Sequence, residues 1–187
     1  METLPMGNRK FIEDLKDLVQ LDYDAIQAYD QATSHINEDH IRHTLISFRS
    51  DHERHITELS QFITEFGDVA PERSRDLKSF VMEGLTSLQS LLGTKSALLA
   101  MKTNEKIINR RYRKALDSLT MPTVVRNAVL KNFEDEKRHL AFIERALESE
   151  LWKTPTREVQ EAAPAKTGIG IPLSSLRDKS TPPDARL

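Results

Sequence analysis

The chain has 187 residues, of which 38% are hydrophobic and 30% are charged, so it can bury a core and form one domain rather than remain disordered. It contains no cysteine, which excludes disulfides, thiol nucleophiles, zinc–thiolate sites and iron–sulfur clusters. The 27 basic and 29 acidic residues give a net charge of -2, which provides no general attraction to nucleic acid or anionic lipid.

Further absences exclude other classes of protein. No apolar run is longer than residues 97–101, and residues 1–10 lack the hydrophobic stretch of a secretory signal, so we expect a cytoplasmic protein with no membrane span. There is no Gly-x-Ser-x-Gly motif and no glycine-rich phosphate loop. Serine hydrolase and nucleotide-binding functions are therefore not supported.

Two stretches, 8–66 and 94–152, are nearly free of glycine and proline and are rich in good helix formers. The first predicts a helix over 8–35 and a second helix that ends at Phe66, with the turn at a polar cluster and Gly67 as the stop. The second predicts helices over 94–118 and 122–152, with Pro122 in the first turn of the latter. The polar cluster consists of Ser34, Asn37, Glu38 and Asp39.

The connection between the second and third of these helices is long. Residues 76–92 within it predict an extra amphipathic helix, which Gly84 weakens and Gly93 closes. Two short turns on either side of one long crossover are not typical of a simple up-and-down bundle. We therefore predict an all-α fold, an antiparallel four-helix bundle over 8–152 with a long helical crossover.

Residues 153–187 differ in composition, with repeated proline and glycine, and predict a flexible C-terminal tail. The tail contains a small apolar segment at 168–177. This segment is a candidate for docking on a protein partner, and an unstructured tail without a partner is the alternative.

An internal repeat relates the first two predicted helices to the last two, at an offset of about 83 to 84 residues. Apolar matches such as Ile36 with Leu119 are expected whenever two amphipathic helices are aligned, but matches between polar residues are not. The polar matches are Asp22 with Glu105, Tyr29 with Tyr112, and the segment 51–56 with 135–140.

Six polar side chains project from the apolar faces of the predicted helices. They are Asp22, His52, His55, Glu105, Glu136 and His139. Others, including Asp24 and His43, are predicted to point elsewhere. Burying a carboxylate without a partner costs several kcal/mol, so a set with three carboxylates needs compensation. Glu136 and His139 are three positions apart, as are His52 and His55, and this spacing places both members of a pair side by side as ligands. The pattern predicts a metal site, and a metal-free network at a degenerate site is the alternative.

These residues resemble the ferritin-like superfamily, which includes bacterioferritin and rubrerythrin, over about residues 8–152. The resemblance rests on segments 21–29, 51–55 and 136–139 and on Glu105 with Tyr112. It implies that Asp22 and Glu105 are terminal carboxylate ligands, that His55 and His139 are imidazole ligands, and that Glu136 bridges two metal ions. It also implies that Tyr29 and Tyr112 lie beside the ligands or donate electrons, whereas the alternative is a core tyrosine bonded to a neighbouring helix.

The chain departs from this family at His52, which stands where a second bridging glutamate is usual. Imidazole does not bridge as a carboxylate does, and Asp22, Glu105 and Glu136 offer a charge of -3 against the +4 of two divalent ions. Asp51 is the nearest candidate for a further acid. Two metal ions at an asymmetric site are therefore expected, and a single metal ion beside Glu105, Glu136 and His139 is the alternative.

By this resemblance the chain is a non-haem protein that binds iron, or manganese, and reacts it with oxygen or peroxide, as a ferroxidase, in iron handling or in peroxide removal. A homo-oligomer is expected. One rival is a metal-free helical bundle that acts in stress response or as an interaction scaffold. A nucleic-acid partner is not expected, because a solvated basic face explains the cluster of basic residues on the third predicted helix. These residues are Arg110, Arg111, Arg113 and Lys114.

Overall fold

A computed structural model describes residues 6–73 and 93–153, and over these residues the chain forms only helices, turns and loops. Its elements are α1 (Met6–Ser34), α2 (Asp39–Glu65), α4 (Thr94–Leu116), α5 (Thr123–Glu148) and the 3-10 turn η2 (Leu151–Lys153). The predicted all-α fold with four long helices is confirmed. The extra helix predicted over 76–92 lies outside the described residues, as does the predicted tail from residue 154 onward.

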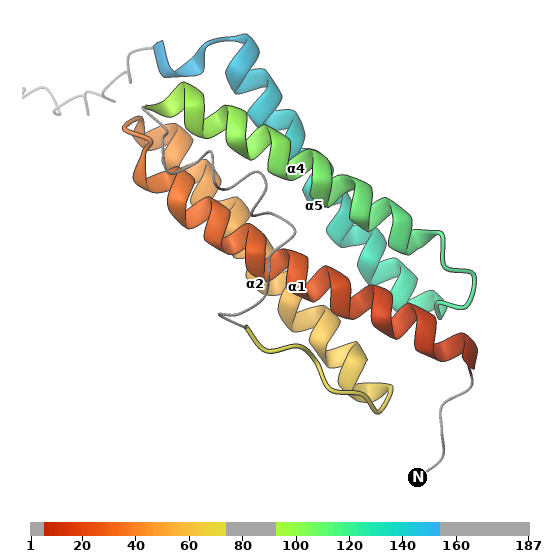
Figure 1. The fold of residues 1–187 in the computed structure, drawn as a ribbon. Helices are drawn as coiled ribbons and strands as arrows, with labels where there is room; N and C mark the ends of the chain where they lie inside the picture. The colour runs from red at the N-terminus through yellow and green to blue at the C-terminus, as the bar shows by residue number, and fades with distance from the viewer. Residues whose placement is uncertain (1–5, 74–92, 154–187) are drawn as a thin grey trace, which may run out of the picture. The chain divides into compact units, whose positions relative to one another are not determined.

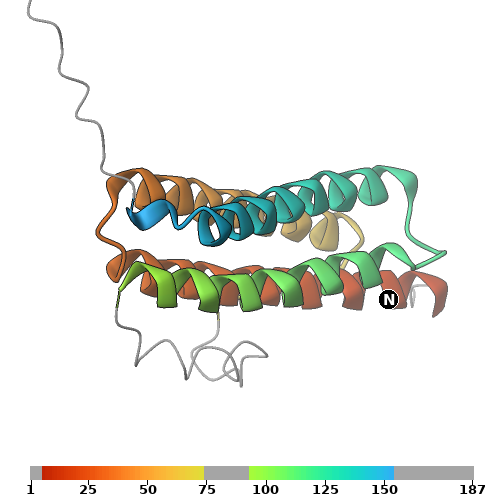
Figure 2. The ribbon, with the colours of Figure 1, turned by 90° about the horizontal axis from the view of Figure 1, so that it is seen from above.

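The four helices form an antiparallel bundle (Figure 1). α1 packs against α2 and α4, and α5 packs against the same two helices. Figure 2 shows α1 and α4 in one layer and α2 and α5 in the other, with neighbouring helices running in opposite directions. α2 ends at the opposite end of the bundle from the start of α4, unlike consecutive helices of a simple up-and-down bundle.

Each helix buries one face, and the buried positions follow the helical period. On α2 the buried residues are Ile41, Leu45, Phe48, His52, His55, Ile56, Leu59 and Ile63. Apolar layers toward both ends of the helix therefore enclose a polar layer near its middle, and each fully buried large aliphatic side chain contributes about 1.5–3 kcal/mol. None of the described helices has a stretch apolar and long enough to cross a membrane.

The end of α2 follows the prediction that Gly67 stops the helix. Gly67 has φ +79, in the left-handed region where glycine is favoured over residues with a Cβ. Its N–H donates to the Thr64 carbonyl at 2.9 Å, and the Asp68 N–H donates to the Ile63 carbonyl at 3.1 Å. These two bonds form a Schellman motif, which satisfies carbonyls that a helix end leaves open.

The second half of the bundle differs from the prediction in three details. Pro122 precedes α5 with extended backbone, φ -58 and ψ 148, and is its N-cap rather than a residue of its first turn. α5 ends at Glu148 instead of Trp152, because Glu150 has φ 48 and interrupts the helix. Leu119, predicted on an apolar face, lies beyond the end of α4 and is 96% exposed.

Candidate metal centre

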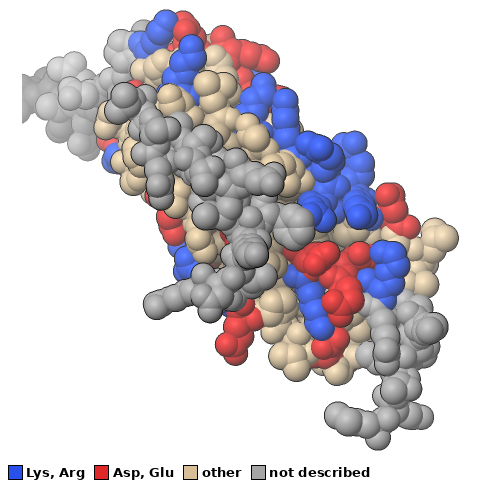
Figure 3. Space-filling model, in the orientation of Figure 1, with Lys and Arg blue, Asp and Glu red and all other residues tan. Residues whose placement is uncertain are grey.

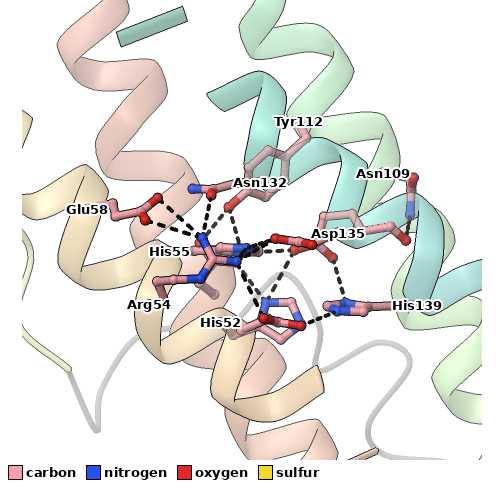
Figure 4. Close-up of polar contacts among 12 residues, drawn as sticks. His52, Arg54, His55, Glu58, Asn109, Tyr112, Asn132, Asp135 and His139 are labelled. Carbon is pink, nitrogen blue, oxygen red and sulfur yellow. Dashed lines mark hydrogen bonds and ion pairs between the residues drawn. The ribbon is translucent and has the colours of Figure 1, made fainter. Parts of the chain in front are cut away.

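The polar layer in the middle of the bundle contains all six side chains predicted to face inward. They are Asp22 on α1, His52 and His55 on α2, Glu105 on α4, and Glu136 and His139 on α5, and each is 0% exposed. The centroids of the His52 and His55 rings lie 5.5 Å apart, and those of His52 and His139 lie 5.3 Å apart. Figure 4 shows His139 reaching from α5 toward His52 on α2. The four helices thus bring six metal-ligand side chains into one buried cluster.

On one side of the cluster, Asp22 links α1 to α2 and α4. Asp22 Oδ1 lies 2.9 Å from His52 Nδ1, and Asp22 Oδ2 accepts a hydrogen bond of 2.7 Å from the Tyr112 hydroxyl. His55 Nδ1 lies 3.1 Å from Glu136 Oε1 on α5. These contacts join all four helices on this side.

On the other side, Glu105 takes the corresponding place on α4. Its Oε1 accepts a hydrogen bond of 2.5 Å from the Tyr29 hydroxyl on α1. His52 Nε2 lies 4.0 Å from the same oxygen, and His139 Nδ1 lies 3.5 Å from Glu136 Oε2. Asp22 and Glu105, which the internal repeat matches, therefore occupy equivalent positions on α1 and α4.

The two tyrosines make matching bonds across the bundle. Tyr29 on α1 donates to the carboxylate on α4, and Tyr112 on α4 donates to the carboxylate on α1. Both rings are fully buried. Each tyrosine therefore bonds to a neighbouring helix and also lies beside a candidate ligand. These positions are compatible with both roles considered for the tyrosines from the sequence.

Charged residues outside the cluster contact the outward nitrogens of His139 on α5 and of His55 on α2. Asp51 Oδ2 lies 3.1 Å from His139 Nε2, and Asp135 Oδ2 lies 3.4 Å from His55 Nε2. Arg54 pairs with Asp135, as Figure 4 shows, and Arg138 pairs with Asp51. Asp51, considered from the sequence as a further acid at the metal, lies on the outward nitrogen of His139. This contact leaves the opposite nitrogen of His139, Nδ1, on the side of Glu136.

Sequence reasoning missed Asp135, although the repeat aligns it with Asp51. It also missed Asn109 on α4, which is 7% exposed. The Asn109 Nδ2 donates to the backbone carbonyls of Glu105 at 2.9 Å and of Glu136 at 3.0 Å. One amide thus ties together the backbone at two candidate ligands. Its signal in the sequence was a polar residue four positions after Glu105.

Asp24 also differs from expectation, because it was predicted to point away from the apolar face but is only 7% exposed. It accepts a weak hydrogen bond of 3.4 Å from Gln20 Nε2 and does not join the six clustered residues. Burial raises the pKa of this carboxyl.

The three histidines of the cluster hold protons strongly in the metal-free protein. Burial alone would lower the pKa of His55, but the contacts with Asp22 and Glu136 outweigh it and raise that pKa to about 10. The pKa of His52 and that of His139 are raised in the same way, because nearby carboxylates outweigh burial. Protons on these rings therefore offset the buried negative charge when no cation is bound.

The pKa values of the carboxyl groups in and around the cluster shift in opposite directions. Burial raises the pKa of Glu105 well above its usual value, and the charge of Glu136 adds to that rise. For Glu136, the surrounding histidines overcome burial and lower the pKa. For Asp51, bonding to His139 overcomes burial and lowers the pKa to about 2. Two neighbouring acids with such different affinities for protons are typical of functional sites.

Several inward atoms of the cluster receive no hydrogen bond from the described residues. They are His52 Nε2, Glu105 Oε2, both carboxylate oxygens of Glu136, and His139 Nδ1, although the Glu136 oxygens lie within ion-pair distance of His55 and His139. Leaving a buried polar atom unsatisfied costs about 1–3 kcal/mol, so a concentration of such atoms in one place is typical of a site that binds a ligand. Carboxylate oxygen and imidazole nitrogen are ligands for divalent transition metals, including iron and manganese. The chemistry of this donor set fits a metal ion.

Two overlapping groups have ligand atoms that all lie within 4.8 Å of one another. The first is Asp22, His52, His55 and Glu136, and the second is His52, Glu105, Glu136 and His139. Both groups are fully buried. The cluster therefore has the donor atoms to hold a metal ion in either position.

The basic residues singled out on α4 lie on its outer face rather than in the cluster. Arg110, Arg113 and Lys114 are exposed, and Figure 3 shows Lys and Arg side chains gathered over the middle of this helix. A shallow groove of about 370 Å³ lies between α4 and α5, lined by Arg110, Arg113, Lys137 and Glu144 among others. Acidic side chains also lie on this face, next to the basic ones (Figure 3).

The comparison with protein families matches the helices that carry most of this cluster. A model described as a domain of unknown function, DUF2383, matches residues 10–118. The matched range holds most of α1 and all of α2 and α4, and it ends before α5. No curated protein matches the chain. Because the family model covers more than half of the 187 residues, the chain belongs to the DUF2383 family.

Proposed function

We propose that this chain is a ferritin-like non-haem metal protein that binds iron, with manganese as the alternative, in the middle of the bundle. The observation that carries the proposal is the group of fully buried carboxylate and imidazole atoms that have no hydrogen bond from the described residues. The four-helix connectivity and the placement of ligand types on all four helices support the same assignment.

A bound iron or manganese ion would supply redox chemistry with oxygen or peroxide, so the proposed activity is ferroxidase, iron handling or peroxide removal. Iron(II) is the substrate in the first two cases. The protein contributes a site from which bulk water is excluded, since the six clustered side chains are 0% exposed. In such a site, charged groups interact more strongly than they do in water.

The two tyrosines have a defined part in this proposal. Burial, reinforced by neighbouring carboxylate charge, raises the pKa of Tyr29 and that of Tyr112 well above the usual value. Each therefore keeps its hydroxyl proton at neutral pH and donates a hydrogen bond, Tyr29 to Glu105 and Tyr112 to Asp22. We propose that they fix these carboxylates in place and are the candidate electron donors to a bound metal.

Metal content tests the proposal directly. The protein is expressed in cells supplemented with iron and manganese, and bound metal is measured by elemental analysis for wild type, Glu136→Ala and His139→Ala. Matched controls on the same elements are Glu134→Ala on α5 and His43→Ala on α2, both at exposed positions. We expect stoichiometric metal in the wild type and both controls, and its loss in both cluster variants.

Turnover is then measured as consumption of oxygen or hydrogen peroxide by the iron-loaded protein. A wild type that stays folded but remains free of metal after repeated loading contradicts the proposal and favours the metal-free bundle. A protein that binds metal but consumes neither oxidant contradicts only the proposed reactivity. Self-association is a separate prediction, and light scattering of the purified protein tests it.

A further inference from the structure

The two groups of candidate ligands share His52 and Glu136 and differ in their other members. The Asp22 half adds Asp22 and His55, and the Glu105 half adds Glu105 and His139. A donor atom already held by another side chain is less available to a metal ion than one that is not. The hydrogen bonds inside the protein therefore distinguish the two halves.

In the Asp22 half, the polar atoms of Asp22 and His55 are all held. Asp22 Oδ1 lies 2.9 Å from His52 Nδ1, and Asp22 Oδ2 accepts a hydrogen bond of 2.7 Å from Tyr112. His55 Nδ1 lies 3.4 Å from the Tyr112 hydroxyl, and His55 Nε2 lies 3.4 Å from Asp135 Oδ2. A metal ion at this half would have to displace these contacts.

In the Glu105 half, the two residues that it does not share with the Asp22 half each present an atom with no hydrogen bond from the described residues. These atoms are Glu105 Oε2 and His139 Nδ1, whereas His52 Nε2 and the two oxygens of Glu136 belong to residues that both halves share. His55 Nδ1 faces Glu136 Oε1 at 3.1 Å, whereas Glu136 Oε2 faces His139 Nδ1 at 3.5 Å. The carboxylate of Glu136 can therefore turn one oxygen to His55 and offer the other to a metal ion.

The opposite atoms of the Glu105 half are fixed by partners outside it. Asp22 holds His52 Nδ1, and Asp51 lies 3.1 Å from His139 Nε2. Tyr29 donates to Glu105 Oε1. When one nitrogen of an imidazole donates its proton to a carboxylate, the other nitrogen presents a lone pair in a fixed direction, as metal-binding histidines usually do. All three ligands are thus held with their free atoms inward.

Charge alone does not separate one ion from two, because the three buried carboxylates of Asp22, Glu105 and Glu136 leave -1 with one divalent cation and +1 with two. The carboxylates of Glu105 and Glu136 together neutralise one divalent cation. A second cation would find only the carboxylate of Asp22, whose two oxygens are already held by His52 and Tyr112.

We infer that the centre holds one divalent metal ion, bound by His52 Nε2, Glu105, Glu136 and His139 Nδ1, and that Asp22 positions His52 instead of binding the ion. The inference rests on the proposed metal binding and assigns the ligands within it. Asp22 and His55, which the ferritin-like resemblance makes ligands, become positioning residues.

Manganese(II) binding to the full chain tests this assignment. Metal-free protein is dialysed against increasing manganese(II), bound metal is measured by elemental analysis, and electron paramagnetic resonance distinguishes an isolated ion from a magnetically coupled pair. Four variants are compared, two from each half: Asp22→Asn and His55→Gln against Glu105→Gln and His139→Gln. Asp17→Asn, at an exposed position of α1, is the matched control, and circular dichroism verifies that each variant folds.

We expect one manganese ion per chain with the signal of an isolated ion. Asp22→Asn and His55→Gln should keep one ion, and Asp22→Asn should weaken its affinity about 10–100-fold, as expected for a partner of a ligand. Glu105→Gln and His139→Gln should abolish stoichiometric binding. Two coupled ions in the wild type, or complete loss of metal in Asp22→Asn, would overturn the single-ion assignment and leave metal binding intact. A folded wild type that binds no manganese or iron would overturn both.

Discussion

Tyr29 and Glu105 are 76 positions apart in the chain, yet the tyrosine hydroxyl donates a hydrogen bond of 2.5 Å to the glutamate carboxylate inside the bundle. The reciprocal bond joins Tyr112 to Asp22 at 2.7 Å. Each bond links α1 with α4, the two helices of one layer. These bonds hold two acidic side chains at the level of the histidines, and the stability of the fold should therefore depend on them.

Replacing Tyr29 with Phe should lower the free energy of unfolding of the metal-free protein by about 1–3 kcal/mol, because it leaves Glu105 Oε1 buried without a donor. Urea denaturation followed by circular dichroism measures the change. Tyr23→Phe, at a half-buried position of the same helix, is the control and should change the stability by less than about 0.5 kcal/mol. Equal effects of the two substitutions would show that the bond to Glu105 contributes no stability of its own.

The metal-free protein should lose stability as the pH rises from about 6.5 to about 10. Folding raises the pKa of His55 from 6.5 to about 10 and also raises those of His52 and His139. Groups with a raised pKa stabilise the folded state fully below the unfolded pKa, and this contribution disappears as the pH rises through the folded pKa. Melting temperatures measured in the presence of a chelator across this range test the slope.

The variant His55→Gln should flatten part of this pH profile. The slope should not vanish, because the raised pKa of Glu105 acts in the same direction. His43→Gln, at an exposed position of α2, is the control and should keep the wild-type profile. A flat profile in the wild type would mean that the clustered histidines do not hold protons in the folded protein.

Manganese(II) or iron(II) should raise the melting temperature of the wild type and a chelator should reverse the effect. A ligand that binds only the folded state adds about 2.7 kcal/mol at a concentration 100 times its dissociation constant, which corresponds to roughly 5–10 °C for a chain of this size. Glu136→Ala should abolish the shift, whereas Glu134→Ala should retain it, since Glu134 is exposed. A shift that persists in Glu136→Ala would place the bound metal outside this cluster.

Ile36 and Leu119 occupy matching positions of the internal repeat but should respond differently to substitution by alanine. Ile36 is 2% exposed, so Ile36→Ala should cost about 2–5 kcal/mol, whereas Leu119 is 96% exposed and Leu119→Ala should cost less than about 0.5 kcal/mol. Chemical denaturation of the two variants compares them directly. Similar losses would indicate that Leu119 is covered in solution.

Much of the fold follows from local physical chemistry that the sequence displays directly. Long stretches of helix formers predict the helices, and Gly67, with its left-handed backbone, ends α2 within one or two residues of the predicted position. The helical period places all six clustered polar residues on buried faces because the same 3.6-residue repeat orders their apolar neighbours. Local signals were weaker at the ends of α4 and α5, where the predicted helices run to Ser118 and Trp152 but the observed ones end at Leu116 and Glu148.

Only the packing of the helices decided which atoms of the cluster remain free. Periodicity places Asp22 and Glu105 equally on inward faces, but it does not reveal that Asp22 has both oxygens held while Glu105 keeps Oε2 without a hydrogen bond. Likewise, no spacing along α5 indicates that Asp135 faces His55 on α2. The sequence by itself determined most of the buried side chains, including all six of the cluster, because burial follows the period of each helix, and it failed at Asp24 and Leu119. The tertiary structure determined their partners, because hydrogen bonds between helices depend on how the helices are placed against one another.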